Sequence, residues 1–238
     1  TWRLRPAAGP VLVGYSVYAN DLSVRGAHVD DRHAYFNGPC VFLRVVGLDQ
    51  APHDVLLEKP GHATASDWRV ATTLPAREVD ADGFGRYSAP DYASLIDYPI
   101  EISDFESVDF EVEGVPHRVV LTGVQKADLA RIGRDLLQIC SVQASIFGPP
   151  LPLERYLFQV TVVGDGYGGL EHRDSTSLIC SRKDLPLAGK EGEKAGYRRF
   201  LGLCAHEYFH LWNVKRIRPA GLAQTDLSSE AYTRQLWA

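Results

Sequence analysis

The sequence predicts an α+β fold, in which an N-terminal antiparallel β domain precedes the first part of a second domain built around two long helices. Two observations support this prediction. Short apolar or alternating runs, separated by Gly, Pro, Asn and Asp, fill residues 1–123. After residue 123, apolar residues recur at helical spacing in two segments. We therefore expect one domain over residues 1–123 and another over residues 124–238.

In the first half, four runs have the composition of strands: residues 11–18, 40–46, 109–113 and 117–121. They are rich in Val, Phe, Tyr and Leu, and turn-forming residues such as Gly47 and Gly114 end two of them. Short strands at this spacing favour an antiparallel sandwich or a barrel-like sheet over a parallel one.

In the second half, the first helix is predicted after Lys126, because Leu129, Ile132 and Leu136 share one face. Gly148-Pro149-Pro150 ends this helix. Two buried strands are expected at residues 156–163 and 175–180, with a glycine-rich loop at 164–169 between them. A polar loop then leads to a second helix over residues 197–212.

Composition excludes several classes of protein. The chain has 238 residues, 45% of them hydrophobic and 23% charged, which is enough to bury a globular core. The net charge is −5 and there is no long basic run, so we expect no nucleic-acid partner. No apolar run approaches the roughly 20 residues of a membrane-spanning helix, so we expect no membrane span. An oligomeric state does not follow from these features.

The four cysteines are widely spaced, with no Cys-x-x-Cys pair, and each lies in an apolar run: Cys40, Cys140, Cys180 and Cys204. This pattern predicts buried free thiols rather than a disulfide scaffold or a thiolate metal site. It favours a cytoplasmic protein, with a periplasmic one as the alternative. Thr1 is not a translation start and the chain contains no Met, so we interpret the sequence as a fragment that lacks both termini.

The second predicted helix carries a zinc-binding pattern, His206-Glu207-Tyr208-Phe209-His210. His206 and His210 are four residues apart and therefore share one helical face, where two imidazoles can bind one Zn²⁺. Glu207 is placed to take a proton from the zinc-bound water and to pass it to a leaving amine. The alternative is a surface helix with two solvated histidines, but the apolar run 200–205 gives this helix a buried back.

A catalytic zinc needs a third protein ligand. Glu230 and Asp226 are the acidic candidates downstream, and for Glu230 a solvated carboxylate near a helix start is the favoured interpretation. A basic cluster follows the zinc pattern: Lys215, Arg216 and Arg218. We interpret it as solvated charge near the helix C-terminus, with recognition of a substrate carboxylate as the alternative.

The segment from His206 to Pro219 closely resembles the active-site helix of the glycyl aminopeptidase family, zinc metallopeptidases of the gluzincin type that often carry a C-terminal PDZ domain. Further similar segments are residues 18–25, 91–101 and 168–172. The resemblance implies a thermolysin-like catalytic domain preceded by a β domain, and a peptide substrate. It also implies a third ligand in a Glu-Gly-Phe-Thr-like segment soon after a Leu-Trp pair. Here Leu236-Trp237 stands at the end, so that ligand is expected beyond Ala238, and this fragment is expected to bind zinc weakly and to be inactive.

Glu171 follows Gly168 and Gly169. In related gluzincin aminopeptidases, a similarly placed strand lies along the substrate and its carboxylate binds the free α-amino group. Glycines permit a close approach of the two backbones, and a carboxylate pairs with the ammonium group. The alternative is a surface carboxylate paired with Arg173. His172 is equally compatible with orienting a polar group in the cleft and with a structural role.

Three hypotheses follow from the sequence. The first is a zinc aminopeptidase that releases N-terminal Gly or Ala from peptides with a free N-terminus, with Glu207 as general base. The second is a zinc endopeptidase in which Glu171 is structural. The third is a non-catalytic peptide-binding module with a vestigial zinc site.

Overall fold

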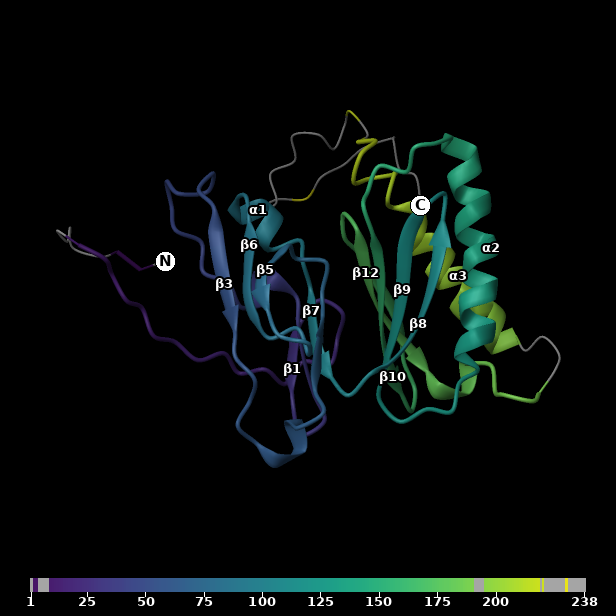
Figure 1. Cartoon of the computed structure of the whole chain (residues 1–238). Helices are drawn as coiled ribbons and strands as arrows, with labels where there is room; N and C mark the ends of the chain where they lie inside the picture. Colours follow the sequence, from purple (N-terminus) through teal and green to yellow (C-terminus); the bar gives the residue numbers. More distant parts are fainter. Residues whose placement is uncertain (1, 4–8, 191–194, 219, 221–229, 231–238) are drawn as a thin grey trace.

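The computed structural model describes residues 2–3, 9–190, 195–218, 220 and 230. Figure 1 shows two sheet-containing parts side by side, with the long helices on the outer face of the second. The strands are β1 (Ala27–Val29), β2 (His33–Phe36), β3 (His53–Leu57), β4 (Arg69–Ala71), β5 (Ala76–Val79), β6 (Gly85–Ala89), β7 (Ile100–Ser103), β8 (Glu106–Val112), β9 (Val115–Thr122), β10 (Tyr156–Val163), β11 (Tyr167–Glu171) and β12 (Ser175–Ser181). The helices are α1 (Tyr92–Leu95), α2 (Leu129–Phe147) and α3 (Ala195–Phe209), with short 3₁₀ turns η1 (Gly38–Cys40), η2 (Ala63–Ala65) and η3 (Arg182–Asp184).

The first part contains a four-stranded sheet in the order β1-β2-β7-β4 and a three-stranded sheet in the order β3-β6-β5. Every strand pair in these two sheets is antiparallel. Trp68, Leu74, Phe84 and Ile100 are buried in the core of this part. The predicted α+β class with an N-terminal antiparallel β domain is therefore confirmed.

The second part contains a five-stranded mixed sheet in the order β11-β12-β10-β9-β8, in which β10 runs parallel to both of its neighbours. Helices α2 and α3 cover one face of this sheet (Figure 1). The Asp128 carboxylate caps α2 by accepting a hydrogen bond from the backbone N–H of Arg131 (2.9 Å). The helix ends at Gly148, whose positive φ of 77° is a conformation that glycine adopts without strain.

Two predicted strands are wrong. Residues 11–18 and 40–46 pair with no other strand among the described residues, and Leu12 is 98% exposed. An apolar run becomes a strand only when a neighbouring chain segment satisfies its backbone groups and covers its side chains, and local composition does not show whether such a neighbour exists. Cys40 is exposed as well, whereas the other three cysteines are buried free thiols as predicted.

The glycine pair of the predicted loop 164–169 lies within strand β11, which begins at Tyr167. The other predicted strands correspond to β8, β9, β10 and β12, and the two predicted helices correspond to α2 and α3. Helix α3 ends three residues earlier than predicted, at Phe209.

The predicted division at residue 123 does not coincide with the boundary between the sheets. Strand β9 pairs with β10, so β8 and β9 belong to the five-stranded sheet, and the change of sheet falls between Ser103 and Glu106. Alternation within a strand does not reveal which sheet the strand joins. The two parts are linked by buried polar contacts, including hydrogen bonds from Thr122 Oγ1 to Glu101 Oε1 (2.9 Å) and from Gln159 Nε2 to the carbonyl of Ala71 (2.8 Å).

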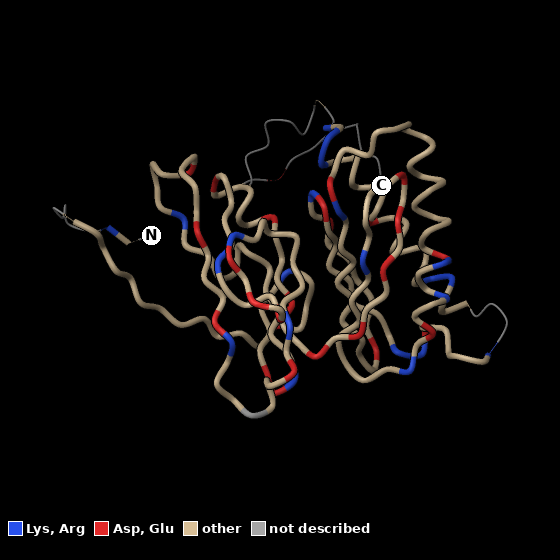
Figure 2. Tube along the Cα trace, in the orientation of Figure 1, with Lys and Arg blue, Asp and Glu red and all other residues tan. Residues whose placement is uncertain are grey.

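Figure 2 shows that acidic and basic residues are interspersed along the described part of the trace. Within this part, no helix is both long and apolar enough to cross a membrane.

Candidate functional site

Helix α3 carries His206 next to the edge of the five-stranded sheet, and His210 follows directly after the last helical residue, Phe209. Its buried side chains include Phe200, Leu203, Cys204 and Tyr208, which pack into the core between α2 and the sheet. His206 Nε2 and His210 Nε2 lie 3.2 Å apart. Two nitrogens that each bind one tetrahedral zinc at about 2.0–2.1 Å are separated by about 3.3 Å, so the spacing fits two ligands of one ion.

The protonation of both rings also suits metal binding. His210 Nδ1–H donates to the carbonyl of Asn213 (2.6 Å), which leaves the lone pair of Nε2 facing His206. Burial and the neighbouring His210 lower the pKa of His206, although the nearby carboxylate of Glu171 opposes this shift. A neutral imidazole is the form that binds a metal ion.

The Glu207 carboxylate is buried beside this pair, with 5% of the residue exposed. Its Oε2 atom has no hydrogen-bond partner among the described residues. Burial raises the pKa of Glu207 to about 7, the charge of Glu171 adds to the increase, and Arg25 opposes it. A buried acceptor with an open lone pair and a pKa near neutrality is suited to accept and return a proton.

Strand β11 passes directly over Glu207 and ends at Glu171. It forms the edge of the sheet, where it pairs antiparallel with β12. Donor atoms of Glu171, Glu207 and His210 all lie within 4.8 Å of one another. The structure thus brings Glu171 to the His-Glu-x-x-His motif, whereas Glu230, one of the two sequence candidates for a third ligand, is exposed. The other candidate, Asp226, lies outside the described residues.

The two glycines of β11 differ in their surroundings. A Cβ atom on Gly169 would lie 2.1 Å from Oε1 of Glu207, well inside van der Waals contact. A Cβ atom on Gly168 would meet nothing within 4 Å. The sequence suggests that both glycines admit a substrate backbone, but the structure gives Gly169 a further role, because it makes room for the Glu207 carboxylate.

A half-buried charged cluster joins the first part of the chain to this site. His172 Nδ1 and Lys215 Nζ lie 3.1 Å and 3.0 Å from Oδ1 of Asp97. Burial alone would raise the pKa of Asp97, but the hydrogen bonds and charges of these two side chains outweigh it and lower the pKa. Asp97 is thus a carboxylate partner of both His172 and Lys215, so Lys215 is paired and not simply a solvated charge.

A second buried contact supports α3 from behind. His117 on β9 donates from Nδ1 to the carbonyl of Val115 (2.8 Å), and its Nε2 accepts a hydrogen bond from the hydroxyl of Tyr208 (2.9 Å). Burial lowers the pKa of His117 to about 4, so this ring is neutral. Sequence reasoning missed His117, Asp97 and Arg25 because their partners are distant in the chain.

Comparison with known protein families gives the class of protein to which the chain is similar. The description Peptidase M61 N-terminal domain matches residues 1–104, and the description M61 glycyl aminopeptidase matches residues 199–238, so that together they match more than half of the chain. The chain belongs to the M61 glycyl aminopeptidase family.

Among solved structures, the chain is similar to an aminopeptidase N family protein from Idiomarina loihiensis, with 43% sequence identity and a TM-score of 0.87. The similarity covers 93% of this chain but 37% of that protein. A search of curated proteins finds no match.

Proposed function

We propose that the protein is a zinc aminopeptidase that releases small N-terminal residues, Gly and Ala, from peptides. One observation carries this proposal: donor atoms of Glu171, Glu207 and His210 converge within 4.8 Å, beside the His206–His210 pair. A metal-binding pair, a buried base and a carboxylate at a strand edge are three of the parts that zinc aminopeptidase chemistry uses, and a third metal ligand would complete the site. The preference for small residues rests on the family description alone.

His206 and His210 would hold the zinc ion, as the 3.2 Å separation of their Nε2 atoms and the hydrogen bond from His210 to Asn213 support. Zinc at such a site acts as a Lewis acid and lowers the pKa of a coordinated water. Glu207 accepts a proton at its unpaired Oε2 and returns it to the amine of the departing product. Glu171 binds the α-ammonium group of the substrate, which fixes the first peptide bond at the site.

We expect His206→Ala to remove one equivalent of zinc from the intact enzyme, relative to the wild type measured in parallel. The substitution removes one imidazole from a site that uses three protein ligands, and the affinity for the metal depends on each of them. Metal analysis of the wild type and the variant after dialysis tests this expectation. His62→Ala is a matched control, because His62 lies in the first part of the chain at the turn η2. Zinc content that is unchanged in His206→Ala would refute the ligand assignment.

We expect Glu171→Gln to lower kcat/KM for peptides with a free N-terminus by roughly 10- to 150-fold. A hydrogen bond between charged groups contributes about 1.5–3 kcal/mol, and the amide keeps the shape but loses the charge. N-acetylated peptides should be poor substrates of the wild type and should be little affected by the substitution. The measurement compares wild type and variant, each on a free and an acetylated peptide of the same sequence.

The same experiment separates the rival functions. Efficient cleavage of acetylated peptides by the wild type would identify an endopeptidase and return Glu171 to a structural role. Zinc loss in Glu171→Gln would make Glu171 a metal ligand instead of the amine-binding group. A zinc-free wild type without hydrolysis would support a non-catalytic peptide-binding module.

A further inference from the structure

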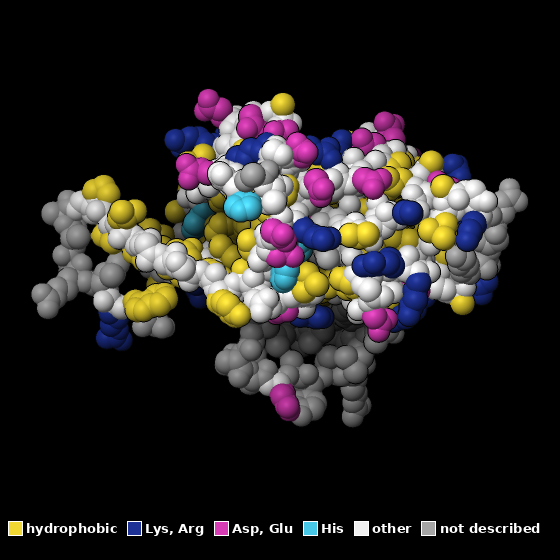
Figure 3. Space-filling view, turned by 90° about the horizontal axis from the view of Figure 1, so that it is seen from below, with side chains coloured by type: hydrophobic (Ala, Val, Ile, Leu, Met, Phe, Trp, Pro, Cys, Tyr) yellow, Lys and Arg dark blue, Asp and Glu magenta, His cyan; other side chains and the backbone are white. Residues whose placement is uncertain are grey.

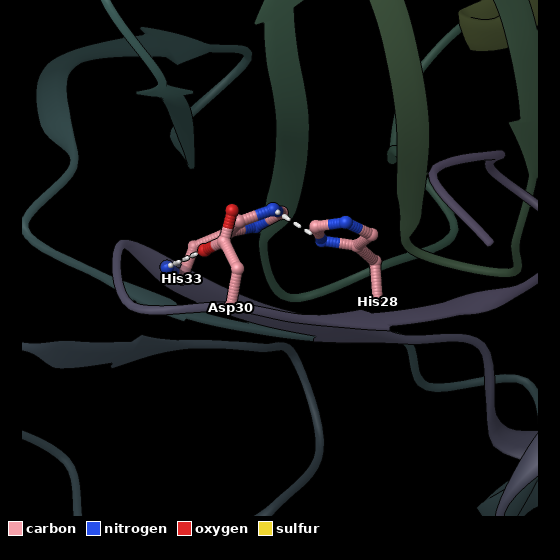
Figure 4. A group of neighbouring side chains, drawn as sticks. All are labelled: His28, Asp30 and His33. Carbon is pink, nitrogen blue, oxygen red and sulfur yellow. Dashed lines mark hydrogen bonds between the residues drawn. The ribbon is translucent and has the colours of Figure 1, made fainter. Parts of the chain in front are cut away.

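The β1–β2 hairpin carries a second group of metal-binding side chains, far along the chain from the zinc pattern. His28 on β1, Asp30 in the turn and His33 on β2 point toward one another (Figure 4). Their donor atoms all lie within 4.8 Å of one another. His28 Nδ1 and His33 Nε2 are 3.0 Å apart, close to the roughly 3.3 Å between two nitrogens on one tetrahedral zinc.

Each member of the group is held by its surroundings. The Oδ1 atom of Asp30 accepts hydrogen bonds from the backbone N–H groups of Arg32 (2.8 Å) and His33 (3.0 Å), which fixes the carboxylate and engages only one of its oxygens. The strand register fixes the two histidines, since β1 and β2 pair from Ala27 with Phe36 to Val29 with Ala34.

A buried carboxylate on the neighbouring strand β7 adds an independent observation. Glu101, which is 2% exposed, places Oε1 3.4 Å from Nδ1 of His33, and His33 itself is 6% exposed. The same carboxylate accepts a hydrogen bond from Thr122, which holds it in place. His33 Nδ1 has no hydrogen-bond partner among the described residues, but a carboxylate at this distance favours a proton on Nδ1. The lone pair of Nε2 is then directed toward His28, an arrangement that is usual for histidines that bind metals.

The group also has access to solvent. His28, Asp30 and His33 line a cavity of about 680 Å³ between the first part of the chain and the ends of β9 and β10. In the view from below, histidine side chains reach the surface beside acidic ones near the middle of the molecule (Figure 3). An ion bound here would therefore have an entry path and a coordination position open to water.

We propose that His28, Asp30 and His33 bind one divalent transition-metal ion of the zinc type, at a site separate from the His206–His210 pair. Two imidazole nitrogens and one carboxylate oxygen match the ligand preference of zinc and cobalt, whereas magnesium and calcium prefer oxygen ligands throughout. The alternative is a proton shared between the two rings, which requires no metal ion. Burial lowers the pKa of His33, but the charges of Glu101 and Asp30 outweigh it and raise the pKa, so only metal binding itself separates the two interpretations.

The position of the site suggests what the ion does. A backbone bridge pairs Asn20 with His28, so His28 stands at the base of the loop that carries Arg25. Arg25 lines a cavity together with Tyr167 and Gly168 of β11, the strand that passes over Glu207. An ion bound by His28 would restrain the base of this loop. It would also link the loop, through His33 and the neighbouring Glu101, to the four-stranded sheet.

The test uses cobalt(II), whose visible absorption reports its coordination, in a chain that carries His206→Ala and His210→Ala. This background removes the other histidine pair, so the result does not depend on the proposed peptidase function. We expect about one equivalent of cobalt to bind. Adding His33→Ala or Asp30→Asn should weaken binding at least tenfold, and Glu101→Gln should weaken it by roughly 10- to 100-fold, as expected for a residue that orients a ligand.

Asp31→Asn is the matched control, because Asp31 is the exposed neighbour of Asp30 and lies outside the group. It should bind cobalt as the background does. Zinc should also raise the melting temperature of the chain that carries His206→Ala and His210→Ala, with or without Asp31→Asn, but not when Asp30→Asn is added. This shift in melting temperature reports metal binding independently of the cobalt absorption. Absence of bound cobalt in the background, or equal losses in Asp30→Asn and Asp31→Asn, would overturn the proposal.

Discussion

Replacing Glu207 with Gln is expected to lower kcat of the zinc-loaded enzyme by roughly 10²- to 10⁴-fold, the usual contribution of a general acid–base group. The amide has nearly the same shape as the carboxylate, so the buried space beside Gly169 stays filled. It cannot accept a proton at the position of Oε2, which has no protein partner among the described residues. Steady-state kinetics at saturating substrate measures the effect.

Zinc content must be determined in the same preparation, because the prediction requires the metal to remain bound. Glu111→Gln makes the same chemical change at an exposed position of β8 and should leave kcat unchanged. Retention of more than a few per cent of the wild-type kcat by Glu207→Gln, with zinc present, would rule out Glu207 as the base.

The parts of this protein that could be predicted are those specified by local spacing. An i, i+4 spacing brings the side chains of His206 and His210 to the same side of a helical turn, and the structure keeps them together although His210 lies one residue beyond the end of α3. The apolar periodicity of α2 and the buried runs of β10 and β12 are likewise contained within single elements. These features therefore agree with the structure to within a few residues.

The parts that could not be predicted depend on which segments become neighbours. Residues 11–18 have strand composition but no partner strand among the described residues, and β8 and β9 join the second sheet although they precede the predicted boundary. The contact between Asp97 and Lys215 joins residues 118 positions apart. The group formed by His28, Asp30 and His33 needs the hairpin register and the buried carboxylate of Glu101, neither of which is visible in the sequence.

Gly169 depends on both local sequence and long-range contacts. The sequence predicts that this glycine is important, but only the structure shows that it lies against Glu207. A methyl group at this position would lie 2.1 Å from Oε1, 2.5 Å from Cδ and 2.7 Å from Cγ of Glu207. Normal contact needs about 3.4 Å or more, so β11 or the Glu207 side chain must shift by roughly 1 Å. The strand is held by its pairing with β12, and we therefore expect the carboxylate to move.

Gly169→Ala should consequently lower kcat by about 100-fold, because a misplacement of about 1 Å at a catalytic group has an effect of this size. Gly168→Ala adds the same methyl group to the same strand where nothing lies within 4 Å, so it leaves the Glu207 carboxylate in place and should lower kcat much less than Gly169→Ala does. Thermal unfolding of both variants shows whether the strand is intact, and zinc analysis shows whether the metal stays bound. If both variants retain wild-type kcat, Glu207 tolerates the shift and its position against Gly169 has no catalytic importance. If both lose activity equally, the effect belongs to the substrate-facing backbone of β11 and not to the contact with Glu207.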